Sequence, residues 1–249
     1  MTMRSLLVRG MAAGLVAGIL ATAFAFTVGE PAIERAIAIE EQGGTVHSHG
    51  PAAAVATPGE PDAPPSISRG MQKTVGLVVG MLALGVAFGG VFAIVFALAR
   101  GRLGISSDRG TALTVAALAF VAVALVPFLV YPANPPAVGH SATIAARTMA
   151  YVGALVVSVL LMVAAVLLQR MLAATHSAWD ATILAGALFV VAAVAIALLL
   201  PAFSEVPAEF PADLLWQFRI ASLGTQLTLW LGIGLAFGAL TERATRRDA

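Results

Sequence analysis

The chain contains six long runs of apolar residues that are free of charged side chains. They cover residues 10–29, 74–99, 110–139, 148–169, 181–204 and 220–241. A hydrocarbon core of about 30 Å is crossed by roughly 20 apolar residues. Backbone polar groups in lipid must be satisfied within the segment, so each run is expected to be a helix. The pattern predicts an all-α, polytopic membrane protein. It is expected to be a six-helix transmembrane bundle with spans at about 10–29, 75–99, 111–131, 148–169, 181–201 and 220–241.

The composition supports a membrane protein with one transmembrane domain over residues 1–249. The chain is 59% hydrophobic and 11% charged, against roughly 25% charged in soluble domains. It has no cysteine, which excludes thiolate metal sites and disulfides. Its net charge is +1 and it has no basic run, so nucleic acid is not an expected partner.

The basic residues predict the orientation of the helices. Nine Lys and Arg residues lie at the termini and in the connections on their side, and five lie in the longer connections on the other side. Basic residues favour the cytoplasmic side, so both termini are expected in the cytoplasm. Nine of the thirteen acidic residues then lie on the outer side. This distribution predicts an outer surface that attracts cations.

The first run has a second interpretation as a secretory signal peptide, because Arg4 and Arg9 precede it and it contains Ala23-Phe24-Ala25. Its length of about 18 apolar residues exceeds the roughly 7–15 of a signal peptide. Its glycines also favour helix packing. An uncleaved helix is therefore expected.

The connections between spans differ in length and character. The long one is expected to hold a short helix at the membrane surface over 32–42 and a flexible outer loop over 43–70, which is rich in Ala, Pro and Gly. The outer loops 131–147 and 201–219 are rich in proline, so they are expected to be stiff.

Glycines recur four residues apart within the runs, and this spacing favours close helix packing. They are Gly10, Gly14 and Gly18; Gly76 and Gly80; Gly85 and Gly89; Gly234 and Gly238. We expect Gly14, Gly85 and Gly234 to face neighbouring helices. The alternative is that glycine is simply common in membrane helices.

The candidate metal site lies in the outer connection, where His47 and His49 follow Glu30 and Glu40. Imidazole and carboxylate together suit divalent cobalt, nickel and zinc. The alternative is a solvated loop without metal.

The interior of the spans carries no Asp, Glu, Lys, Arg or His, although ion pathways usually show one. Ser222, Thr225 and Gln226 cluster in the first turns of the last span. They either line a cavity, together with Met11, Met81 and Met162, or bond within and between helices. No arrangement typical of an enzyme or of ATP binding is present, so the chain is not expected to be an enzyme.

Several segments together resemble the CbtA family of proposed cobalt transporter subunits. The strongest are Tyr-Pro-Ala-Asn-Pro-Pro-Ala-Val-Gly at 131–139 and Phe-Pro-Ala-Asp-Leu-Leu-Trp-Gln-Phe-Arg at 210–219. Further support comes from Gly29-Glu30-Pro31, the Glu40-Glu41 pair and the following His-Ser-His.

The resemblance implies a subunit of the bacterial inner membrane that acts in cobalt uptake for cobalamin synthesis, with Co²⁺ as the transported ion and no cofactor. It implies a small single-span CbtB-type partner subunit, and a homo-oligomer is a further expectation. Glu30, Glu40, His47 and His49 are the positions that correspond to the family's acidic and His-containing outer segment. The alternative function is a non-transporting membrane scaffold or assembly subunit that docks a partner through its outer loops.

Overall fold

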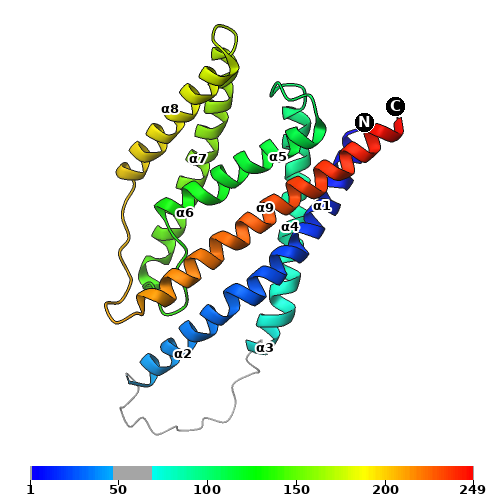
Figure 1. Cartoon of the computed structure of the whole chain (residues 1–249). Coiled ribbons are helices and arrows are strands. Elements are labelled where there is room, and N and C mark those ends of the chain that lie inside the picture. The colour runs from blue at the N-terminus through cyan, green and yellow to red at the C-terminus, as the bar shows by residue number, and fades with distance from the viewer. Residues whose placement is uncertain (1, 47–68, 249) are drawn as a thin grey trace.

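The computed structural model describes residues 2–46 and 69–248, and these are almost entirely helical (Figure 1). Six of the described helical segments are long and apolar enough to cross a membrane. In chain order the elements are α1 (Met3–Phe24), the π-helical turn η1 (Ala25–Gly29), α2 (Glu30–Val46), α3 (Arg69–Met71), η2 (Gln72–Gly76), α4 (Leu77–Ala99), α5 (Asp108–Ala119), η3 (Phe120–Leu125), α6 (Val126–Val130), η4 (Ser141–Thr143), α7 (Ile144–Leu172), α8 (Ala178–Leu199) and α9 (Ala212–Asp248).

Both ends of the chain lie at one end of the helical bundle, together with the α4–α5 and α7–α8 connections (Figure 1). We call this the proximal end. The opposite, distal end holds the 131–143 loop, the 200–211 loop and the C-terminal part of α2. Six crossings with both termini on one side agree with the alternation expected from the sequence. The predicted flexible loop over 43–70 lies largely outside the described residues.

Two helices are longer than the sequence predicted. The segment 32–42 is not a separate surface helix, because α1, η1 and α2 form one continuous helix. Likewise α9 begins at Ala212, within the segment expected to be a loop. The two extensions pack against each other at the distal end through Ala32 and Ala36 of α2 and Leu214 of α9. Burial of these apolar faces stabilises helical turns that would be marginal alone.

Two of the π-helical turns precede prolines inside the long helices. The turn η1 ends two residues before Pro31, and η3 ends two residues before Pro127. A proline ring clashes with the carbonyl four residues earlier and leaves it without an amide donor. A widened turn accommodates this clash while the helix continues.

The bundle is held together where α1, α4, α5 and α9 meet. A Cβ atom on Gly14 would overlap the Gly85 carbonyl, and one on Gly10 would overlap the Gly89 carbonyl, so α1 and α4 touch through their backbones. A Cβ atom on Gly234 of α9 would lie 2.6 Å from Ala116 of α5. Cβ atoms built on Gly14, Gly85 and Gly234 therefore point at neighbouring helices. In contrast, the space around Gly80 is open.

Aromatic side chains fill the space that the small residues leave. The buried ring of Phe237 in α9 lies edge-on to Phe92 and Phe96 of α4, with centroids 5.2 and 4.8 Å apart. The ring of Trp230 stacks on Phe88 at 5.3 Å. These contacts join α9 to α4 along the length of the core.

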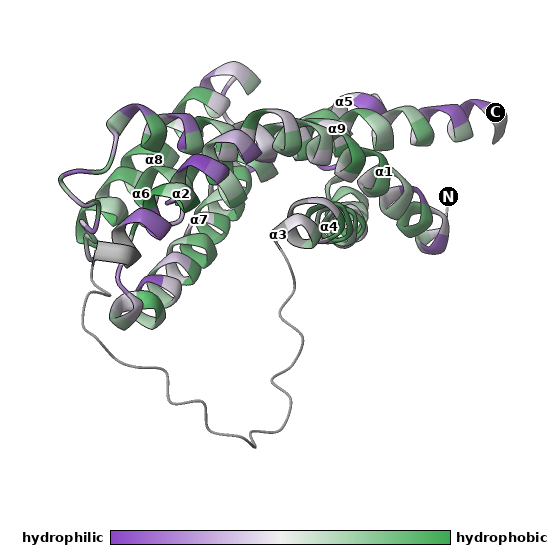
Figure 2. Ribbon diagram, turned by 90° about the horizontal axis from the view of Figure 1, so that it is seen from below, coloured by the Kyte–Doolittle hydropathy of each residue, from purple (hydrophilic) through white to green (hydrophobic). Residues whose placement is uncertain are grey.

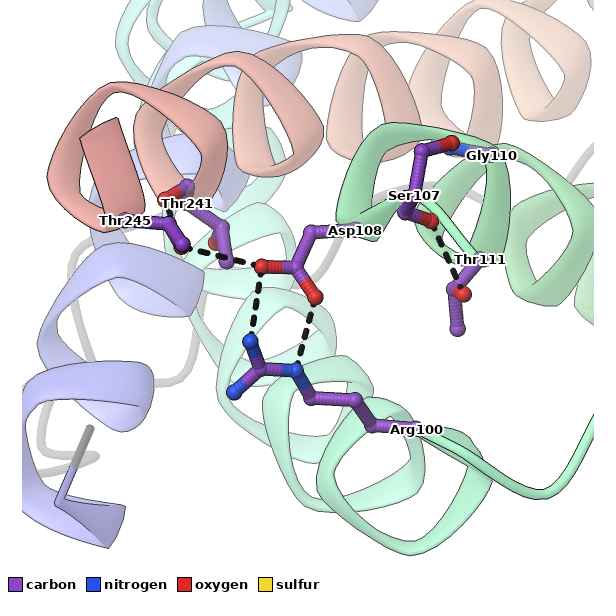
Figure 3. Close-up of polar contacts among 7 residues, drawn as sticks. All are labelled: Arg100, Ser107, Asp108, Gly110, Thr111, Thr241 and Thr245. Atoms are coloured by element: carbon purple, nitrogen blue, oxygen red, sulfur yellow. Dashed lines mark hydrogen bonds and ion pairs between the residues drawn. The ribbon is translucent and has the colours of Figure 1, made fainter. Parts of the chain in front are cut away.

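A polar network closes the proximal end of this unit (Figure 3). Arg100, which caps α4, donates two hydrogen bonds of 2.7 and 2.9 Å to Asp108 at the start of α5. The Thr245 hydroxyl of α9 donates to the same carboxylate at 3.0 Å. The Ser107 side chain caps α5 by accepting from the Gly110 amide. One carboxylate therefore links three helices.

Candidate functional site

A cavity with a volume of about 580 Å³ lies at the distal end of the described structure. Its walls come from η3 and α6, the 131–134 segment, the start of α7, the 200–211 loop and α9. Volumes of roughly 300–1,000 Å³ are typical of small-molecule sites. We call it the distal cavity.

The two segments that carry the family resemblance meet at this cavity. Arg219, which ends the second segment, donates from Nη2 to the Asn134 side-chain oxygen at 3.1 Å. Its Nε donates to the Ala133 carbonyl at 3.4 Å. Helix α9 presents the guanidinium to the 131–139 segment because it already begins at Ala212.

A second arginine is neutralised by an acidic partner. Arg147 of α7 forms an ion pair of 3.4 Å with Glu205, and the His140 amide donates to that carboxylate at 2.8 Å. Hydrogen bonds from Thr143 and His140, with Arg147 nearby, hold the pKa of Glu205 below its usual value. A Cβ atom on Gly139, where φ is +112°, would lie 2.8 Å from Nη2 of Arg147. The positive φ at this position favours glycine, because residues with a Cβ atom rarely adopt it.

A tyrosine also connects the 131–143 and 200–211 loops through a hydrogen bond and a ring contact. The hydroxyl of Tyr131 donates to the Pro201 carbonyl at 2.8 Å, and its ring lies 5.9 Å from the ring of Phe203. Burial raises the pKa of the Tyr131 phenol. The Tyr131 contacts join the two loops; their predicted stiffness stays a prediction.

Three polar side chains of α9 line the cavity. Arg219, Ser222 and Gln226 are spaced three and four residues apart, which places them on one face of the helix. The Gln226 Oε1 atom is buried and has no hydrogen-bond partner. Thr225 instead bonds to the Ala221 carbonyl of its own helix. Of the two alternatives that the sequence left open, the cavity holds for Ser222 and Gln226, and the bond within the helix holds for Thr225.

The three methionines named in the cavity alternative, Met11, Met81 and Met162, do not line the distal cavity. Met11 projects outward with 46% exposure. Met81 packs against the hydrophobic core of the bundle. The walls are instead aromatic and aliphatic, with Phe128, Tyr151 and Phe203 among them.

The charge of the cavity is positive. Two arginines and no carboxylate line it, and Glu205 offsets only Arg147. Within the described ranges 2–46 and 69–248, the partners of Arg219 are neutral oxygens. A bare divalent cation in this cavity would be repelled by Arg219.

The residues of the candidate metal site lie elsewhere. Glu30 starts α2 and is 4% exposed, whereas Glu40 is exposed near the end of α2. Ten residues of helix separate the two carboxylates by roughly 15 Å, so the structure does not bring them together. His47 and His49 lie outside the described residues. The described residues contain no group of three His, Asp or Glu that suits a metal ion.

On the sequence alone, Arg147 is a charge that sets the orientation, and Arg219 is such a charge and the end of the 210–219 segment, but neither is placed in a site. A usable signal was present, because Arg219 stands three and seven residues before Ser222 and Gln226, on one helical face. The contact of Arg219 with Asn134 bridges 85 residues of sequence. Local patterns do not show such a contact.

The six apolar helices and their polar distal end define the chain as a multi-pass membrane protein. Figure 2 shows hydrophilic residues gathered on α2 and at the C-terminal end of α9, while α4, α7 and α8 are mainly hydrophobic. The model of the CbtA family, described as a probable cobalt transporter subunit, matches residues 3–242. The chain therefore belongs to the CbtA family. No curated protein and no solved structure matches it significantly.

Proposed function

We propose that this protein is the multi-span subunit of a cobalt uptake system that serves cobalamin synthesis in the bacterial inner membrane. The observation that carries the proposal is the family match, which covers nearly the whole chain. The excess of basic residues on the side of both termini supports a cytoplasmic proximal end and an outer distal end.

The segment around the end of α2 is proposed to collect Co²⁺ from the outside. Glu40, His47 and His49 lie within ten residues of one another, and carboxylate with imidazole suits cobalt. Glu30 lies roughly 15 Å back along the helix towards the membrane. We therefore assign Glu30 to a later contact of the ion rather than to the same set of ligands.

A partner subunit is proposed to complete the ion pathway. The spans expected from the sequence carry no Asp, Glu, Lys, Arg or His, and the distal cavity repels cations through Arg219. The family is described as a subunit, which fits a small single-span CbtB-type partner or a second copy of this chain. In this arrangement the chain supplies the outer collecting segment and the helical scaffold.

A scaffold or assembly subunit is the second candidate function. The lack of a metal-ligand group in the part of the chain that the structure describes favours it. In that case the 131–143 and 200–211 loops would dock the partner, and the partner would move the ion.

Radioactive cobalt accumulation tests the proposal in cells that lack their own cobalt uptake. We expect uptake with the chain and its small partner together, and little with the partner alone. The paired changes His47→Ala and His49→Ala should reduce uptake at low cobalt concentration. His176→Ala, at the proximal end, is the matched control and should behave as wild type.

Two results would contradict the proposal. Full uptake by the partner alone, produced at a matched level in the membrane, would favour the scaffold. Uptake by the His47 and His49 double variant that equals wild type at all cobalt concentrations would remove the collecting role from this segment.

A further inference from the structure

The distal cavity combines a guanidinium that has no acidic partner among the described residues with a buried amide oxygen of Gln226 that has no hydrogen-bond partner among them. Within residues 2–46 and 69–248, Arg219 bonds to the Ala133 carbonyl and the Asn134 amide oxygen, at 3.4 and 3.1 Å. No carboxylate lines the cavity in the described structure. A guanidinium in such a site is stabilised by an oxyanion, because charge-assisted hydrogen bonds are about twice as strong as neutral ones.

The neighbouring groups on α9 suit the polar parts of such a ligand. Ser222 stands one turn from Arg219, and Gln226 stands one turn further. The Gln226 amide has a buried oxygen without a partner, which is costly unless a ligand or water supplies a donor. The hydroxyl and the amide both donate and accept hydrogen bonds.

The size and walls of the cavity indicate more than a bare ion. A volume of about 580 Å³ accommodates an organic molecule of moderate size. Phe128, Tyr151 and Phe203 supply apolar walls opposite the polar face of α9. Tyr151 is 41% exposed on α7, so the cavity adjoins a surface that faces outward from the bundle.

We propose that the distal cavity binds an organic oxyanion, a carboxylate or a phosphate ester, whose charge pairs with Arg219 and whose polar groups contact Ser222 and Gln226. The anion comes either from a phospholipid headgroup or from a free solute. The proposal does not depend on cobalt transport, and its test measures the binding of an anion in the absence of cobalt.

Thermal unfolding of the full chain in an uncharged detergent tests the proposal, since a ligand of the native state raises the melting temperature. The soluble probes are citrate and inorganic phosphate, each at matched ionic strength against sodium chloride. The lipid probe is phosphatidylglycerol in nanodiscs, compared with phosphatidylcholine nanodiscs. A shift with the soluble probes identifies a solute site, and a shift confined to phosphatidylglycerol identifies a headgroup site.

Four variants locate the binding. Arg219→Gln should weaken binding roughly tenfold or more, and Arg219→Lys should retain part of it. Ser222→Asp places a carboxylate one turn from Arg219 and should compete with the ligand while leaving the contacts of Arg219 with the 131–139 segment in place. Arg35→Gln removes an exposed distal arginine outside the cavity and should bind as wild type.

The proposal is overturned if no probe shifts the wild-type protein beyond the salt control. It is also overturned if Ser222→Asp retains the full wild-type shift. Should Arg219→Gln fail to fold, Ser222→Asp and Arg219→Lys still decide the outcome.

Discussion

The helices α1, α4, α5 and α9 and the hairpin of α7 and α8 are all long and apolar enough to cross a membrane, yet they are packed very differently. In the most apolar stretch of α9, 39% of the residues are buried within the chain, against 11% for α7 and 6% for α8. The first unit brings backbones together at Gly14 and Gly85 and fills the remaining space with aromatic rings. The hairpin presents valine and leucine outward along most of its length.

In the first unit a Cβ atom on Gly14 or Gly85 would overlap the neighbouring backbone, whereas the space around Gly153 and Gly186 in the hairpin is open. Lipid tails are as apolar as leucine, so close packing in a membrane depends on shape rather than on apolarity. The four-helix unit is therefore expected to be sensitive to changes of side-chain volume. The hairpin is expected to tolerate them.

The largest expected effect comes from Gly14→Leu. A leucine there would overlap the backbone of α4, because even a Cβ atom overlaps the Gly85 carbonyl. We expect loss of the folded protein, measured as the monodisperse yield after detergent extraction. Gly186→Leu in α8, where the space is open, is the matched control and should keep a normal yield. Equal yields would show that the contact between α1 and α4 does not limit folding.

The next effect in size is expected from Phe237→Ala. This ring is fully buried between Phe92 and Phe96, and truncation of a buried Phe costs about 3–5 kcal/mol in soluble proteins. Denaturant unfolding in mixed micelles should show a loss near the lower end of that range. Val191→Ala in α8, which is 64% exposed, should change the unfolding free energy little. A small loss for Phe237→Ala would mean that the core collapses to refill the space.

The same contrast explains how far the sequence predicted the fold and the site. Runs without charge reveal six spans because hydropathy acts locally. The lengths of α2 and α9 were underestimated, since their ends are helical through contact with each other at Ala36 and Leu214. Arg219 was not recognised as a cavity residue because its partner Asn134 is 85 positions away. Glycine spacing indicated helix contacts, but it did not separate Gly85, which has a partner, from Gly80, which has none.

A third prediction compares α5 and α8, each of which has a serine at its N-cap and an aspartate in its first turn. Asp108 binds Arg100 and Thr245 from two other helices, whereas Asp180 bonds its own cap residue Ser177. Asp108→Asn should cost about 1–3 kcal/mol of unfolding free energy, because hydrogen bonds to a charged group are lost. Asp180→Asn should stay within about 0.5 kcal/mol. Similar losses in denaturant unfolding would assign both aspartates to helix capping alone.

The smallest expected effect concerns the polar tie between α7 and the 200–211 loop, where Glu205 meets Arg147 and the His140 amide. The folded-state pKa of Glu205 lies below the ordinary value of 4.5. Its ionised form therefore stabilises the fold above pH 4.5, and this contribution is lost as the pH falls through the folded-state pKa. Melting temperatures between pH 7 and pH 3 should fall more steeply for wild type than for Glu205→Gln, and the two curves should converge at the acidic end. Glu209→Gln, an exposed change in the same loop, should follow the wild-type curve. Parallel curves for wild type and Glu205→Gln would show that the ion pair between Glu205 and Arg147 does not contribute to the stability of the fold.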